Sequence, residues 1–339
     1  MNSKKQIIAD FCKSTGLLRL LVAVPRRPVL VVLNYHRIGM PAECPYDRDV
    51  ISATPEAFDE QVRFLKSSFH VAGPGEVEEI ADRPNRLKRM IVALTFDDGY
   101  RDNHDLAFPI LRSHGMAAFF FLPTSYIGTS RVPWWDQVAF MVRNTRKLVL
   151  RMSYPTPVEY RIPSEGPDGV IREILRRFAA PDVHEPERFL HDVEVACGVN
   201  RPEHSPAPLF LDWCQVSRLS EAGMGIGSHT HRHDILGRMP VQKQREEFEV
   251  SRRVLEERTG KPVRTLAYPV GTPTSFTPRT ASLLAEVGYK AGFSYYGGIN
   301  TKHGFDPFNI RRIAVETDIA HSVLKLRVLA AAISGREII

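Results

Sequence analysis

Short runs of apolar residues recur along the chain and alternate with longer amphipathic segments. The apolar runs are rich in β-branched and aromatic residues, and they cover 29–33, 91–96, 117–122, 224–227, 263–268, 289–294 and 308–315. Such runs are typical of strands buried on both faces of a parallel sheet. The amphipathic segments predict helices over 55–68, 105–114, 241–258 and 278–287. Seven strands alternating with helices predict an α/β protein, built as an irregular parallel (β/α)7 barrel.

One long segment interrupts this alternation. Residues 129–208 mix helical and proline-rich stretches, and they are far longer than an ordinary connection between strands. We expect a mainly helical insertion over one rim of the barrel. Its two tryptophans, Trp134 and Trp135, could stack on sugar rings or pack the insertion onto the barrel. The barrel is expected over 29–325, with a basic amphipathic segment over 1–28 before it and a tail over 326–339 after it.

The positive charge is concentrated at the N-terminus. The net charge is +6, and nearly all of it comes from the lysines and arginines of residues 1–35. The rest of the chain is close to neutral, which argues against a protein-wide footprint for nucleic acid. The basic segment also carries an apolar helical face. It predicts either peripheral contact with a membrane surface or a helix packed across one end of the barrel.

The sequence contains neither a convincing signal peptide nor a transmembrane span. Its longest apolar stretch, 17–24, is interrupted by Arg19 and ends at Pro25, well short of the roughly 18 residues that a span needs. Four cysteines lie far apart without a paired spacing, which favours reduced thiols over a disulfide framework or a thiolate zinc site. We therefore expect a cytoplasmic protein, with membrane association left open.

Four polar clusters each follow a predicted strand. They are Tyr-His-Arg at 35–37, Asp-Asp-Gly at 97–99, the histidine-rich segment 229–233, and Tyr-Pro-Val-Gly at 268–271. Active sites of parallel barrels are built at the carboxyl ends of the strands. The placement of these clusters therefore predicts one shared site at that rim.

Two of the clusters carry the residue types of a metal-dependent hydrolase. Adjacent carboxylates at Asp97 and Asp98 can divide the work, one binding a metal and the other handling protons, although a turn or helix cap also uses such residues. His229 and His233 have the i,i+4 spacing that places two imidazoles on one face of a helical turn. Two histidines and one carboxylate leave a coordination position open for water or substrate, as in catalytic zinc sites. The alternative for the histidines is a surface cluster.

The motifs TFDDG at 95–99 and SHTHRH at 228–233, in this order, resemble those of the polysaccharide deacetylases with the NodB homology domain, carbohydrate esterase family 4. The similarity covers about 29–128 and 209–315. The segments LNYHRIG at 33–39 and PWWDQVA at 133–139 resemble a bacterial subgroup associated with exopolysaccharide synthesis.

The resemblance implies roles for individual residues. Asp97 is expected as the general base, and Asp98, His229 and His233 as ligands of a divalent metal, most simply Zn²⁺, with Co²⁺ or Ni²⁺ as alternatives. It also implies that Thr230 stabilises the histidine loop through its hydroxyl. The remaining expected site residues are Val270, whose N–H would hold the oxyanion, Tyr268, Pro269 and Trp135 at the substrate, and Arg312 at the entry of the last strand.

Two features depart from the family pattern. Many relatives carry an arginine in the third motif, where this chain has Ala267, and Arg311 or Arg312 could replace it from the neighbouring strand. The late Leu-x-His that supplies the general acid is also missing. His36 is our preferred replacement, since it follows the first strand, and the alternative is a buried histidine that bonds a backbone carbonyl.

These residues favour an N-deacetylase acting on N-acetylhexosamine units of a polysaccharide or a lipid-linked saccharide. Hydrolysis of another C–N bond or of an O-acetyl ester is compatible with the same site, and so is a non-catalytic glycan-binding relative. A glycosidase is disfavoured, because that chemistry needs two carboxylates on opposite sides of the scissile bond. An acetylated glycan is thus the expected partner, and the oligomeric state stays open.

Overall fold

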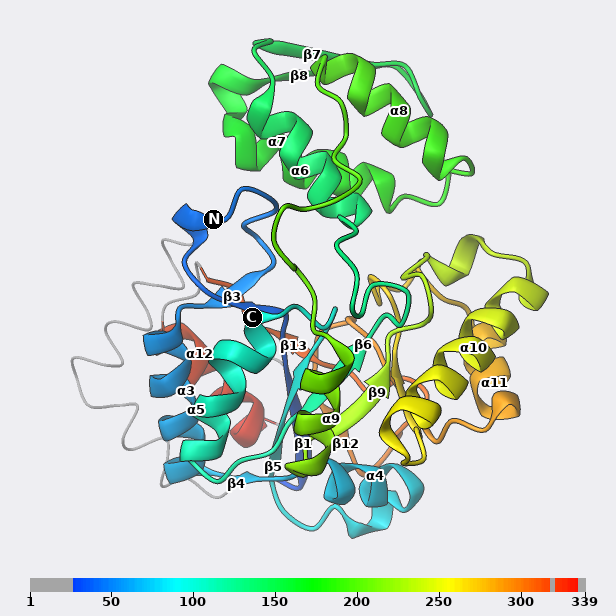
Figure 1. The fold of residues 1–339 in the computed structure, drawn as a ribbon. Helices are drawn as coiled ribbons and strands as arrows, with labels where there is room; N and C mark the ends of the chain where they lie inside the picture. Colours follow the sequence, from blue (N-terminus) through cyan, green and yellow to red (C-terminus); the bar gives the residue numbers. More distant parts are fainter. Residues whose placement is uncertain (1–26, 318–320, 335–339) are drawn as a thin grey trace.

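The computed structural model describes residues 27–317 and 321–334. Its centre is a curled, mostly parallel sheet surrounded by helices (Figure 1). The strands of the sheet are β11 (Ala291–Phe293), β10 (Thr265–Ala267), β9 (Gly225–Ser228), β6 (Phe119–Leu122), β5 (Ile91–Phe96), β1 (Val29–Tyr35) and β12 (Asn300–Thr301) in spatial order, with β13 (Ile313–Ala314) beside β1 and β4 (His70–Val71) beside β5.

The two ends of the sheet approach each other through one segment. Ile313 and Ala314 pair with β1, while Ile310 forms a bridge to Phe293 of β11. All seven apolar runs of the sequence contribute a strand to this arrangement, which confirms the predicted α/β class and the curled parallel sheet. One strand departs from the prediction, since β12 runs antiparallel to β1.

Alternate residues of the strands face two different cores. In β1, Val29, Val31 and Leu33 belong to the layer between the sheet and the helices, whereas Leu30 and Val32 point into the curl. Phe121 packs there against Phe293 at 5.0 Å between ring centroids. Burial of both faces explains why these strands read as continuous apolar runs.

The helices cover the outside of the sheet and close one end of it. They are α3 (Pro55–Ser68), α5 (Phe108–Ser113), α9 (Trp213–Glu221), α10 (Val241–Thr259), α11 (Pro278–Val287) and α12 (His321–Ser334), with α4 (Pro74–Asp82) at the end away from the site. Short elements complete this part: β2 (Arg37–Ile38), η1 (Pro41–Glu43), β3 (Ile51–Ala53), η2 (Pro84–Arg86), η3 (Asn103–Ala107) and η4 (Leu236–Arg238). The predicted stop at Gly288 is confirmed, because this residue ends α11 with a positive φ of 98°.

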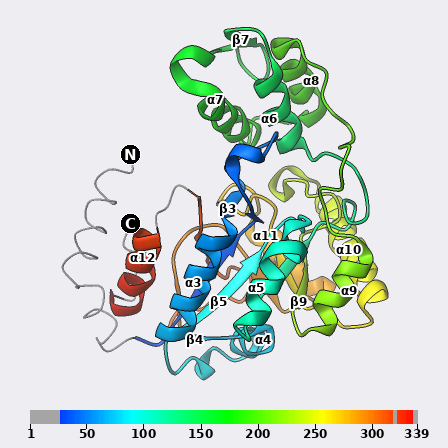
Figure 2. The same cartoon turned by 60° about the vertical axis from the view of Figure 1, so that its left-hand side comes forward.

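The chain between β6 and β9 builds a lobe opposite α4 (Figures 1 and 2). The lobe consists of α6 (Trp134–Asn144), β7 (Val149–Met152), β8 (Val158–Arg161), α7 (Ile162–Phe178, interrupted at Gly166) and α8 (Pro186–Cys197). Its apolar residues form a buried cluster distinct from the barrel cores. The segment 129–208 was expected to sit over one rim, and this lobe stands at the end of the sheet where β5 and β9 finish.

The register of the sheet aligns the carboxyl ends of its strands. Tyr35 pairs with Phe96, Leu122 with Ser228, and Ala267 with Phe293. The residues that follow these pairs, among them His36, Asp97 and His229, therefore begin at one common edge below the lobe.

Two expectations concern the chain ends. The basic segment over 1–28 lies almost wholly outside the described residues, and so does its expected membrane contact. Helix α12 runs across the boundary expected between 325 and 326. Among residues 27–317 and 321–334, no helix is long and apolar enough to cross a membrane.

Candidate metal centre and active site

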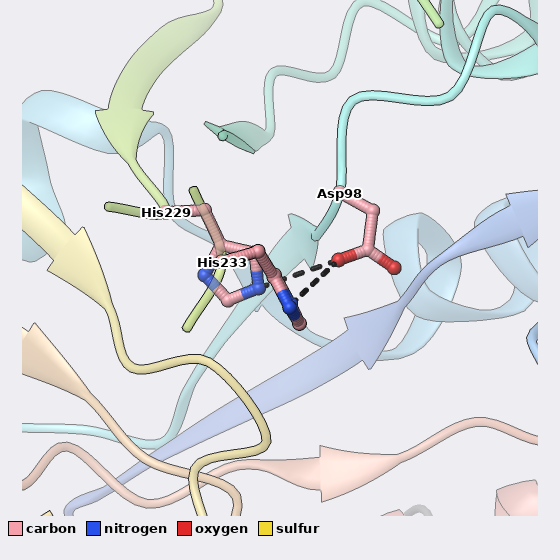
Figure 3. Close-up of side chains that lie close together, drawn as sticks. All are labelled: Asp98, His229 and His233. Atoms are coloured by element: carbon pink, nitrogen blue, oxygen red, sulfur yellow. Dashed lines mark ion pairs between the residues drawn. The ribbon is translucent and has the colours of Figure 1, made fainter. Parts of the chain in front are cut away.

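Asp98, His229 and His233 converge beneath the lobe (Figure 3). The Oδ1 atom of Asp98 lies 3.4 Å from Nε2 of His229 and 3.3 Å from Nε2 of His233. All three side chains are buried. The structure thus brings together the three residues that the sequence predicted as metal ligands.

The donor atoms of this cluster fit a bound cation. Nδ1 of His229 donates a hydrogen bond to the carbonyl of Ala267 at 2.7 Å, so its Nε2 presents a lone pair toward Asp98. Asp98 Oδ1 is buried and accepts no hydrogen bond from any described residue. Such an oxygen facing imidazole lone pairs is costly unless a positive charge lies between them. Ligand atoms around a tetrahedral zinc ion are separated by about 3.3 Å, which matches the two measured distances.

The electrostatics of Asp98 agree with this interpretation. Burial alone raises the pKa of the carboxyl, but positive charge on the side of His229 and His233 outweighs burial and holds the pKa well below its usual value. The group is therefore a carboxylate at neutral pH, the form that a metal ligand requires.

The two histidines do not lie on a helical turn, so that part of the prediction is wrong. The segment between them is irregular, and Thr230 and His233 have positive φ values of 65° and 60°. The hydroxyl of Thr230 accepts a hydrogen bond from the N–H of His233 at 3.1 Å, and the hydroxyl of Ser228 accepts one from the N–H of Thr230 at 3.0 Å. Local side-chain bonds of this kind stabilise a tight loop in place of a helix.

Glu247 of α10 supports the same loop from behind, and sequence reasoning missed it. One carboxylate oxygen accepts hydrogen bonds from the N–H groups of His231 and Arg232, both at 2.8 Å. The other oxygen accepts one from the Arg232 side chain at 3.0 Å. Glu247 is buried although it lies on a strongly charged helix. The sequence marks this residue only as one of several glutamates on that helix.

Asp97 is not one of the three clustered residues, and its carboxylate is held by Arg312. The guanidinium donates to Oδ1 at 2.8 Å and to Oδ2 at 2.7 Å. Burial raises the pKa of Asp97, but the ion pair with Arg312 outweighs burial and keeps the pKa below its ordinary value. Asp97 is thus ionised and fixed in orientation. The two adjacent carboxylates have different partners, Arg312 for Asp97 and the histidines for Asp98, and Asp98 has a left-handed conformation (φ 70°).

Arg312 is itself fixed on three sides. Its Nη1 donates to the side-chain oxygen of Asn34 at 2.6 Å, and its Nε donates to the carbonyl of Ser294 at 3.0 Å. Arg311 and Arg312 were the two candidates to replace the family arginine, which is absent at Ala267. Of these two, Arg312 is the one that binds Asp97. Arg311 instead lines a separate cavity in the loop around Gly298.

The other expected site residues occupy different places. His36 and Val270 line the cavity above the metal cluster, and no described residue accepts a hydrogen bond from the Val270 N–H. Tyr268 also lines the cavity, but its ring stacks on Phe276 and its hydroxyl donates to the carbonyl of Phe308. Trp135 is buried against His233, with 4.4 Å between ring centroids. Pro269 is buried and does not line the cavity.

The cavity has a volume of about 380 Å³ and lies between barrel and lobe. Its walls are formed by His36, Asp47, Asp49, Val50, Asp97, Asp98, Trp134, Trp135, Arg172, Leu175, His229, His233, Tyr268, Val270, Tyr295, Arg312, Val315 and Glu316. Sequence reasoning missed Tyr295, although the residue follows a predicted strand and the argument from the carboxyl ends of strands applies to it. Asp47, Asp49 and Arg172 lie outside the strands and carry no comparable signal.

Comparisons with known proteins agree with this geometry. Over 100 residues the chain is 27% identical to YxkH of Bacillus subtilis (strain 168); the match covers 29% of this chain and spans about a third of that relative's length (33%). Among solved structures, the deacetylase PplD of Streptococcus pyogenes in complex with acetate aligns with a TM-score of 0.57 and 19% identity, over 89% of this chain and 98% of that one. IcaB from Ammonifex degensii aligns with a TM-score of 0.55 and 18% identity, over 89% and 97%.

At these identities the solved structures establish a shared fold. The family model described as polysaccharide deacetylase matches residues 84–154 and 191–292, which is just over half of the chain. The matched ranges contain Asp97 and the three clustered side chains. This chain therefore belongs to the polysaccharide deacetylase family.

Proposed function

We propose that the chain is a metal-dependent hydrolase that removes N-acetyl groups from N-acetylhexosamine units of a polysaccharide or a lipid-linked saccharide. One observation carries the proposal: an ionised Asp97, oriented by Arg312, opens into the same cavity as the Asp98, His229 and His233 cluster. A base and a cation site side by side are the parts that hydrolysis of an acetamide requires.

The chain's own residues divide the reaction between them. Asp97 accepts the proton of the attacking water, and its ion pair with Arg312 keeps the carboxylate aimed into the cavity. The free N–H of Val270 donates to the oxyanion that develops on the acetyl carbon, a preorganised stabilisation of the transition state. His36 lines the cavity, and its imidazole has no hydrogen-bond partner among the described residues. It is therefore available to protonate the leaving nitrogen.

Asp98, His229 and His233 would hold the divalent cation, with Zn²⁺ as the first choice and Co²⁺ or Ni²⁺ as alternatives. Bound there, the ion polarises the acetamide carbonyl and lowers the pKa of water. The nitrogen and carboxylate donors suit each of these metals.

The substrate assignment is supported by the family and by two sequence segments. LNYHRIG at 33–39 and PWWDQVA at 133–139 resemble the exopolysaccharide-associated subgroup, and an exopolysaccharide or its precursor is the substrate we propose. The neighbour PplD was solved with acetate, the product that N-deacetylation would release. The non-catalytic alternative relied on the absent motif arginine and the absent general acid, and the ion pair between Arg312 and Asp97 removes the first of these reasons.

The test is acetate release from acetylated chito-oligosaccharides by metal-stripped protein, before and after addition of zinc or cobalt. Asp97→Asn is the critical variant, and Asp182→Asn, an exposed change on the lobe, is its matched control. We expect release that depends on the metal, that Asp97→Asn abolishes and that the control retains. Binding of one metal per chain without acetate release would contradict the proposal. Release of acetate from O-acetylated sugars alone would identify an esterase instead.

A further inference from the structure

A second cavity lies beside the first, between the lobe and the loop that follows His233. It has a volume of about 500 Å³ and is called the junction cavity below. Trp134 lines both cavities. A third depression of about 430 Å³ shares Arg131 and Gln137 with the junction cavity. The concave surface therefore continues away from the metal cluster along the junction of lobe and barrel.

Aromatic rings connect the first cavity to the junction cavity. The ring of Trp135 lies 4.4 Å from His233, Trp134 lies 5.3 Å from Trp135, and Phe178 stacks on Trp134 at 4.1 Å with 23° between the ring planes. Trp135 lines the first cavity and Phe178 lines the second. Trp134 is only half-buried, so its surface is accessible between them. Flat apolar rings with polar neighbours suit the faces of sugar rings.

Polar side chains around the junction cavity are free to bind a ligand. The guanidinium of Arg131 lies over the ring of Tyr126 at 5.3 Å and forms no ion pair with a described residue. The imidazole of His184 likewise has no hydrogen-bond partner among the described residues. Such donors match the hydroxyl and acetamido oxygens of a saccharide.

The charges of the lining side chains narrow the choice of ligand further. The lining holds four cations and two carboxylates, but Arg232 is paired with Asp234 and Glu247, Lys243 with Glu246, and Glu187 with Arg201. Arg131 and Arg238 are the lining cations that form no ion pair with a described residue. This excess of positive charge disfavours a sugar that bears a free ammonium group. An uncharged acetylated sugar meets no such electrostatic repulsion.

We propose that the junction cavity is a distal subsite for an acetylated saccharide chain whose reacting unit lies at Asp97 and Asp98. This inference rests on the proposed function for the identity of the reacting unit. It assigns to the lobe the binding of a sugar unit beyond the one that reacts. The substrate is then an oligosaccharide or polysaccharide that lies along the junction, and the affinity rises with chain length once the junction cavity is reached.

The experiment measures binding in the metal-loaded Asp97→Asn protein, where turnover cannot consume the ligand. Calorimetric titration with acetylated chito-oligosaccharides, from the monosaccharide to the pentasaccharide, gives affinity against chain length. The same series is run with Arg131→Ala/His184→Ala, with Trp134→Leu and with Trp134→Phe. Arg176→Ala is the matched control, since Arg176 is an exposed arginine of α7 that lines neither cavity.

We expect the parent to bind long chains at least about fivefold more tightly than the monosaccharide, the scale of one aromatic contact. The double variant and Trp134→Leu should lose this gain, whereas Trp134→Phe and Arg176→Ala should keep it. Glucosamine oligomers of equal length should bind more weakly than acetylated ones. Affinity independent of length, or a gain that survives both variants, would overturn the inference. Because binding is measured without turnover, these outcomes are separate from whether acetate is released.

Discussion

Arg312 and Asp97 are 215 residues apart in the sequence, yet their side chains form a two-point ion pair deep in the protein, with distances of 2.8 and 2.7 Å. The same guanidinium is tied to Asn34 and to the carbonyl of Ser294. The expected base is therefore oriented by a residue from the last strand segment. The planar guanidinium presents parallel N–H donors that match both carboxylate oxygens, and the ammonium group of lysine cannot reproduce this arrangement.

Replacing Arg312 with lysine should lower kcat while the metal site is retained. The positive charge remains, but the second hydrogen bond to Asp97 and the bonds to Asn34 and Ser294 are lost. Because small misplacements of a catalytic group have large effects, we expect kcat to fall about a hundredfold. Acetate release and zinc content should be measured on the same preparation. Unchanged kcat would show that the orientation of Asp97 does not depend on Arg312.

Glu247→Gln should weaken metal binding, although Glu247 is not one of the clustered ligand residues. The glutamine loses the charge and keeps only one acceptor oxygen, so it cannot accept from both the N–H groups of His231 and Arg232 and the Arg232 side chain. Changes behind the ligands of a metal site lower the affinity by about 10- to 100-fold. Zinc affinity can be measured by competition with a chelator. Glu249→Gln, an exposed change on the same helix, is the control, and equal affinities for the two variants would contradict the prediction.

His36→Gln should separate amide hydrolysis from ester hydrolysis. An amine leaves poorly without a proton, so loss of the acid should lower the rate on an acetamido sugar about a hundredfold or more. An activated acetyl ester needs no such proton and should be hydrolysed at a nearly unchanged rate. Both substrates are assayed at saturating zinc, with His303→Gln on a distant loop as the control. Equal losses on the two substrates would argue against His36 as the acid.

The buried carboxyl group of Asp47 should contribute stability at acidic pH that is lost as the pH rises toward neutrality. Burial and the neighbouring Asp136 raise the pKa of Asp47 to about 7. The unfolded chain has the lower, ordinary pKa, so the contribution of Asp47 to stability is complete at acidic pH and is lost as the pH rises through about 7. In Asp47→Asn, the free energy of unfolding should fall less between pH 5 and pH 8 than in the parent. Asp182→Asn is the exposed control, and identical pH profiles for Asp47→Asn and the parent would refute the assignment.

The positions of the strands along the chain and the edge that carries the site were accessible from the sequence. Strands buried on both faces leave a continuous apolar signal, and the side chains that follow them share one edge because parallel strands point the same way. Asp98, His229 and His233 were found through this argument together with their residue types. The structure places all three within reach of one ion.

The remaining parts of the site depend on relationships that have no periodic signal. The ion pair between Arg312 and Asp97 joins segments that are distant in the sequence. Only the closure of the sheet determines which arginine lies next to Asp97. The i,i+4 spacing of His229 and His233 indicated a helical turn, but hydrogen bonds accepted by the hydroxyls of Thr230 and Ser228 stabilise an irregular loop with positive φ values. The support from Glu247 was missed because its helix carries many similar residues.

The lobe leaves the barrel after β6 and the chain returns before α9. The strands on either side of this excursion, β6 and β9, pair directly, with Phe119 opposite Gly225. The entropy lost on closing such an excursion grows only with the logarithm of its length, so that doubling the length costs about 0.6 kcal/mol. The apolar residues of the lobe are buried mainly against one another and not against the core of the barrel. Its size and sequence can therefore diverge during evolution at little expense to barrel stability. With the sugar-binding role proposed for the lobe, exchange of this one excursion would change the glycan preference and leave the metal ligands of the barrel in place.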